Sequence, residues 1–129
     1  MLTVDLDYRT YQLSDADGVK VDVRPLTVEA NQACIRVVMR NLAASAATEK
    51  DKNAGTMALV MDAESLAVAK EVLPLHARNL VGITVREKGE TRPATVEDLT
   101  AHAPLFGIAL TILAHLMSIS VLAEQEAGN

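Results

Sequence analysis

The sequence predicts an α+β fold that is predominantly helical, with an N-terminal β-hairpin followed by a helical bundle that includes a second short hairpin. Polar and apolar residues alternate near the N-terminus, apolar residues recur at helical spacing in the middle, and the chain ends in a long apolar run. A length of 129 residues is that of one ordinary domain. We therefore expect a single domain over 1–129, divided into a hairpin at 1–25, helices at 27–80, a hairpin or loop at 82–95 and C-terminal helices at 96–125.

The N-terminal hairpin is predicted from two alternating segments. Residues 2–13 place Leu2, Val4, Leu6 and Tyr8 against polar neighbours, and "VKVDV" at 19–23 alternates in the same way. The stretch "SDADG" between them is rich in turn formers. It resembles part of a calcium loop but lacks the other ligands and the closing glutamate, so we interpret it as a plain turn.

Two helical regions are expected next. Thr27 is a suitable N-cap, Glu29 lies in the first turn, and the following apolar residues share one face, which predicts a helix over 27–48. A charged, glycine-bearing connection covers 48–55. The second helical region, about 56–80, is apolar on more than one face, and Pro74 should kink or break it.

The segment "GITVREKGETRPAT" at 82–95 predicts a short hairpin or an extended loop, with Lys88-Gly89 as its turn. Thr95 then caps a short helix, with Asp98 three residues later as in a capping box. Pro104 separates this helix from the final one.

The final run, "LFGIALTILAHLMSISVLA" at 105–123, carries no formal charge and is long enough to span a membrane. Its small and polar residues Gly107, Thr111, Ala114, His115 and Ser118 fall in one narrow sector, which is either a close-packing seam or the wet side of the helix. Neither flank offers a basic anchor or an aromatic belt, which favours a soluble protein. We expect the large apolar residues of this helix to bind a partner: Phe106, Leu110, Leu113, Leu116 and Met117.

Composition and motifs indicate no catalytic residues, no metal ligands and no cofactor, and we expect a non-enzymatic protein. The net charge of −5 and the three aromatic residues disfavour nucleic-acid binding. His76, His102 and His115 lack the spacing of metal ligands. Cys34 is the only cysteine, so we expect a buried, inert thiol and a reducing compartment. The N-terminus has no signal-peptide pattern.

The order of these elements resembles the tail assembly chaperones of long-tailed bacteriophages. The resemblance lies in "VDVRPLTVEA" leading from a hairpin into a helix, in "NLVGITVREKG" and "ATVEDL", and in an apolar helix that runs into "ISVLAEQEAGN". It implies a protein of the host cytoplasm that self-associates and binds the helical tape-measure protein. Such a chaperone keeps this client soluble until the tail-tube protein displaces it.

Two alternative functions remain open from the sequence. A virion structural or adaptor protein would use the same apolar surfaces in a fixed oligomer, whereas a chaperone would associate reversibly with its client. A small membrane protein would span the bilayer with residues 105–123 and depend on detergent. We expect no nucleic-acid partner and no membrane partner.

Overall fold

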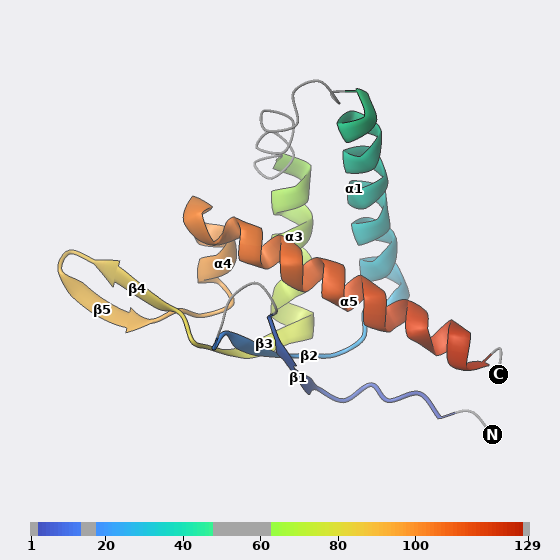
Figure 1. Cartoon of the computed structure of the whole chain (residues 1–129), viewed down its shortest axis with the longest axis horizontal. Helices are drawn as coiled ribbons and strands as arrows, with labels where there is room; N and C mark the ends of the chain where they lie inside the picture. Colours follow the sequence, from blue (N-terminus) through green and yellow to red (C-terminus); the bar gives the residue numbers. More distant parts are fainter. Residues whose placement is uncertain (1–2, 14–17, 48–62, 128–129) are drawn as a thin grey trace.

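The computed structural model describes residues 3–13, 18–47 and 63–127 of the chain (Figure 1). Helix and strand both contribute to the fold in these ranges, with strands in two separate sheets. The expected turn at 14–17, the connection at 48–55 and the start of the second helical region at 56–62 lie outside them. In chain order the elements are β1 (Arg9–Gln12), β2 (Lys20–Val23), α1 (Val28–Ala47), α3 (Ala63–His76), β3 (Ala77–Val81), β4 (Thr84–Glu87), β5 (Glu90–Pro93), α4 (Asp98–Ala101), a 3₁₀ turn (Ala103–Leu105) and α5 (Phe106–Ala127).

The N-terminal hairpin is confirmed, since β1 and β2 pair antiparallel with Tyr11 opposite Val21. Strand β1 begins only at Arg9, so it is shorter than the alternation over 2–13 suggested. Its partner β2 ends at Val23, and Pro25, which has no backbone N–H, follows directly. Residues 3–8 therefore extend beyond the end of the partner strand, and we call them the arm.

The expected α+β class is confirmed, but the sheet has a third strand that the sequence did not predict. Helix α3 ends at His76, four residues before the predicted end at Leu80, and the chain continues as β3, which pairs antiparallel with β2. Pro74 lies two residues before the helix end, where a missing N–H and a crowded ring make continuation costly. The fold is consequently mixed, with the strand order β1-β2-β3, and the expectation that helix predominates holds only in part.

Helix α1 agrees with its prediction over 27–48 to within one residue at each end. The backbone N–H of Ala30 donates to Thr27 Oγ1 at 3.2 Å, which is the expected cap. Helices α1 and α3 run beside each other, and α5 crosses both of them (Figure 1). The three-stranded sheet lies near the end of α3 from which β3 begins.

The second hairpin is also confirmed, and it projects from the body of the protein (Figure 1). Lys88 and Gly89 form its turn with φ angles of 53° and 80°, the conformation that a two-residue hairpin loop requires. The guanidinium of Arg92 holds the Asp98 carboxylate through two bonds of 2.7 Å, which fastens β5 to α4. The same carboxylate accepts from the Thr95 N–H at 2.8 Å, which is one of the two bonds of the expected capping box. Thr95 itself does not cap α4, because this helix begins at Asp98 with Glu97 at its N-cap.

The hydrophobic core lies where α5 crosses the other helices and covers one face of the sheet. Leu73, Leu99, Ile112 and Leu116 are fully buried there, and aliphatic residues make up nearly all of it. Phe106 is its one aromatic member among the described residues. This packing decides which face of α5 is covered and which is left to solvent.

Candidate partner-binding surface

One face of α5 forms part of the core. Its five buried residues recur at intervals of three or four, which is the spacing of a single helical stripe: Phe106, Ala109, Ile112, Leu113 and Leu116. They contact side chains from α1, α3 and α4. The residues that the structure describes on the rest of the helix circumference are half-buried or exposed.

The opposite face is uncharged and only partly buried. Its middle is the small and polar seam expected from the sequence, and the structure places Gly107, Ala114 and Ser118 of this seam in solvent. Larger apolar side chains border the seam on both sides. We call this surface the α5 outer face, and its members are Gly107, Ile108, Leu110, Thr111, Ala114, Met117 and Ser118.

The five residues predicted to bind a partner divide between the two faces. Phe106, Leu113 and Leu116 are buried, with 4%, 7% and 0% of their surface exposed, so their side chains pack in the core of this conformation. Leu110 and Met117 are half-buried on the border of the α5 outer face. Only these two offer side-chain surface to a partner without rearrangement of the core.

The low burial of this helix is unusual for its composition. The window Ala103–Ser120 is long and apolar enough to cross a membrane by length and composition, and it is the one such window in the described residues. Only 28% of it is buried inside the protein. An apolar helix that served purely as core would be covered on most sides. Much of the apolar surface of α5 is therefore only partly covered by the described part of the chain.

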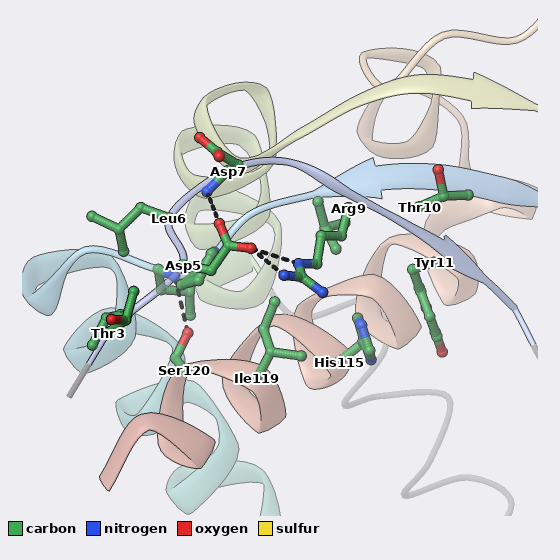
Figure 2. Close-up of a pocket in the computed structure, with 14 residues that line it drawn as sticks. Thr3, Asp5, Leu6, Asp7, Arg9, Thr10, Tyr11, His115, Ile119 and Ser120 are labelled. Carbon is green, nitrogen blue, oxygen red and sulfur yellow. Dashed lines mark hydrogen bonds and ion pairs between the residues drawn. The ribbon is translucent and has the colours of Figure 1, made fainter. Parts of the chain in front are cut away.

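A groove of about 1190 Å³ adjoins the α5 outer face (Figure 2). One wall is the arm with the start of β1, and the other is formed by His115, Ile119 and Ser120 of α5. Val23, Pro25 and Leu26 line it where β2 leads into α1. The arm adds the exposed apolar side chains of Val4 and Leu6, which are 47% and 64% exposed.

An aromatic stack closes one end of the groove. The rings of Tyr11 on β1 and His115 on α5 lie nearly parallel, with their centroids 3.6 Å apart (Figure 2). Partial burial lowers the pKa of His115 below its ordinary value, because the charged imidazolium loses hydration there. The neutral ring is therefore favoured, and it presents a flat apolar face to Tyr11.

Polar contacts stabilise both walls of the groove. Arg9 forms an ion pair with Asp5, and the hydrogen bond from its guanidinium lowers the pKa of the Asp5 carboxyl. The Asp5 carboxylate also accepts from the Asp7 N–H at 2.9 Å, which bends the arm. On the far wall, Ser120 Oγ accepts the N–H of Leu26 at 2.9 Å and donates to the Leu116 carbonyl at 2.7 Å. This hydroxyl links α5 to the start of α1.

Cys34 and His76 do not line the groove. Cys34 is buried, as predicted, and burial raises its pKa to about 11, which leaves little thiolate at neutral pH. His76 is buried, with its Nδ1 2.8 Å from the Val72 carbonyl. Across the described residues, His, Cys, Asp and Glu side chains do not gather into any group of three that could hold a metal ion.

Comparison with known proteins adds nothing to this picture: no family model, no curated protein and no solved structure matches the chain.

Sequence reasoning identified the helix but missed the groove. The five predicted residues were chosen because they are large and hydrophobic. Such residues belong mainly to the buried stripe of α5, and three of the five lie there. Arg9, Tyr11 and the arm were read only as parts of a strand. The Asp5–Arg9 spacing and the unbroken alternation of the arm were the available signals, yet neither indicates that α5 lies opposite.

Proposed function

We propose that this protein is a non-enzymatic tail assembly chaperone of a long-tailed bacteriophage, which acts in the host cytoplasm. It binds the helical tape-measure protein and keeps it soluble until the tail-tube protein displaces it. The observation that carries the proposal is the uncharged and only partly buried outer face of α5, because a chaperone of this kind must present apolar surface to its client.

The form of this surface suits an amphipathic helix. Small residues along the middle of the α5 outer face allow the backbone of a second helix to approach closely. Leu110 and Met117 border it with larger side chains, and methionine adapts to different neighbours. A client helix would lay its own apolar stripe along this face and extend toward the groove beside the arm.

The experiment that tests the proposal is co-expression with the tape-measure protein encoded by the same phage. We expect the client to aggregate when expressed alone and to co-elute with this chain in detergent-free size-exclusion chromatography with light scattering. Leu110→Asp combined with Met117→Asp should abolish co-elution and leave the chain folded, since both side chains are half-buried rather than buried. Val81→Asp is the control, because Val81 is 52% exposed on β3 and does not line the groove beside α5.

The alternative functions give different results in the same experiment. A structural or adaptor protein would run as a fixed oligomer that leaves the client insoluble, and it would be found in the assembled virion. A membrane protein with its span at 105–123 would require detergent for extraction. Either result would reject the chaperone proposal.

A further inference from the structure

The arm is anchored to the body of the protein at Tyr8. This side chain is half-buried, and its hydroxyl donates to the Leu75 carbonyl at 3.3 Å. Two guanidinium groups lie against its ring, with Arg78 Cζ 3.8 Å and Arg24 Cζ 5.5 Å from the ring centroid, which are favourable cation–π contacts. Tyr8 therefore fixes the end of the arm that leads into β1.

The rest of the arm, residues 3–7, is held much more weakly. These residues belong to no strand, and the Asp7 N–H bonds to the Asp5 carboxylate within the arm itself. Among the described residues, the ion pair of Asp5 with Arg9 joins this segment to β1, and both of its side chains are exposed. Exposed ion pairs contribute little to stability. A segment that is anchored at one end and weakly held beyond it changes position at small cost.

This weakly held segment carries two large apolar side chains in solvent. Val4 and Leu6 are both exposed, and both line the groove. The groove lies between the arm and α5, where Ile119 forms part of the opposite wall, with Leu26 nearby (Figure 2). Burial of apolar side chains is favourable in proportion to the area removed from water. The arm would gain this burial from an apolar occupant of the groove.

The size and position of the groove suit a segment of polypeptide. Its volume of about 1190 Å³ is above the range of roughly 300–1,000 Å³ that is usual for small-molecule sites. Its α5 wall is continuous with the α5 outer face, because His115 follows Ala114 and lies one helical turn after Thr111. A helix bound along the outer face would therefore reach the groove without a gap.

The charges that line the groove favour a basic over an acidic residue in this segment. Asp5 and Asp7 supply two carboxylates, whereas Arg9 supplies one guanidinium, which is paired with Asp5. The carboxylate of Asp7 forms no ion pair with a described residue. Loss of hydration lowers the pKa of His115, so the ring adds no positive charge at neutral pH. The fitting occupant is apolar, with a basic residue that pairs with Asp7.

We propose that the arm is a strap that closes over a client segment in the groove, with Tyr8 as its anchor and Val4 and Leu6 as its contacts to the client. The proposal rests on the chaperone function proposed above, because the client helix on the α5 outer face supplies this segment. The client is then held between the arm and α5. Since the arm closes after the client has bound, it slows release of the client more than it speeds binding.

The first test measures association and dissociation rates with purified tape-measure protein. Val4→Ser combined with Leu6→Ser removes the apolar contacts of the strap. Leu75→Ser combined with Val81→Ser is the matched control, because it makes the same two changes at side chains that are 59% and 52% exposed, close to the 64% and 47% of Leu6 and Val4, and that do not line the groove. We expect the arm variant to release the client at least about tenfold faster, with association within about twofold of the wild type. The control should behave as the wild type, and circular dichroism should show both variants to be folded.

The second test follows closure of the arm directly through maleimide labelling of Leu6→Cys. The native thiol gives little background, because Cys34 is buried and largely protonated. We expect the Cys at position 6 to react rapidly in the free chain and at least about tenfold more slowly with the tape-measure protein bound. Val81→Cys is the control, and its labelling rate should not change when the client binds.

These measurements separate the strap from the chaperone function on which it rests. If the wild type binds the client but the arm variant releases it at the wild-type rate, the strap is wrong and the chaperone proposal stands. Equal labelling of Leu6→Cys with and without bound client would overturn the strap in the same way. If the wild type does not bind the tape-measure protein at all, both proposals are rejected.

Discussion

The rings of Tyr11 and His115 lie 3.6 Å apart at an interplanar angle of 4°, and they join the N-terminal hairpin to the last helix of the chain. These residues are separated by most of the sequence. Their stack forms one end of the groove beside the arm, so it fixes the distance between β1 and α5.

The stack should contribute to stability as a coupled pair. We expect a double-mutant cycle with Tyr11→Ala and His115→Ala, followed by urea unfolding, to give a coupling free energy of about 1 kcal/mol. A matched cycle with Tyr8→Ala and His115→Ala should give no coupling, because Tyr8 contacts Arg24 and Arg78 instead. Additive effects of the Tyr11 and His115 changes would show that the rings do not interact in solution.

The lowered pKa of His115 predicts a pH dependence of stability. Between the folded pKa and the unfolded value of about 6.5, the unfolded state binds more protons, so stability rises with pH there. Above about pH 6.5 the His115 ring is neutral in both states and does not affect the free energy of unfolding. As the pH falls below this value, protonation of His115 in the unfolded state lowers the stability of the fold. Urea midpoints measured from pH 7.5 to 5.5 should fall less steeply for His115→Phe, which keeps a ring but cannot titrate. Parallel curves for the two proteins would contradict the prediction.

Gly82 lies where a side chain has no room. Its φ is +92°, and a Cβ there would meet the Gly18 carbonyl oxygen at 2.1 Å, a backbone atom that cannot move aside alone. We expect Gly82→Ala to destabilise the fold by about 3 kcal/mol in thermal or urea unfolding.

Alanine substitutions at two other glycines distinguish the effect of the clash at Gly82 from the effect of a positive φ alone. Gly89 has a φ of +80° with nothing within 4 Å of a Cβ, so Gly89→Ala should cost only about 1 kcal/mol. Gly107 is helical and open, and Gly107→Ala should stabilise by about 0.5 kcal/mol. Equal losses at Gly82 and Gly89 would mean that the contact with Gly18 is absent.

The clamp between Arg92 and Asp98 should make the protein sensitive to acid. Bonds from Arg92 and from the Thr95 N–H hold the Asp98 pKa well below its usual range. The stabilisation is present above the unfolded pKa of about 4 and is lost as the pH falls toward the folded value. Asp98→Asn should cost about 2 kcal/mol at pH 7, and its difference from the wild type should shrink at pH 3. A difference that is the same at both pH values would contradict this explanation.

Local signals in the sequence predicted most of the elements. The Thr27 cap, the alternation of β1 and β2 and the Lys88-Gly89 turn each act within a few residues, and each is found in the structure. Strand β3 was missed because "ARNLV" does not alternate, and because its partner β2 is more than fifty residues away in the sequence. Pairing over such a distance leaves no periodic pattern.

The candidate site was harder to predict for a related reason. Periodicity indicates which residues of α5 share a face, but not which face meets the core. Leu113 was chosen as a surface residue and is buried, whereas the small seam around Ala114 faces solvent. The groove depends on the arm and α5 lying together, which only the folded chain reveals.

The central claim is that the α5 outer face binds the client, and the most direct test is an affinity measurement with purified tape-measure protein. Leu110→Asp combined with Met117→Asp should weaken binding at least about a hundredfold, because two apolar contacts are replaced by charges. Circular dichroism should show both this variant and the Val81→Asp control to be folded, and the control should bind as the wild type does. Unchanged affinity in the folded double variant would contradict the account.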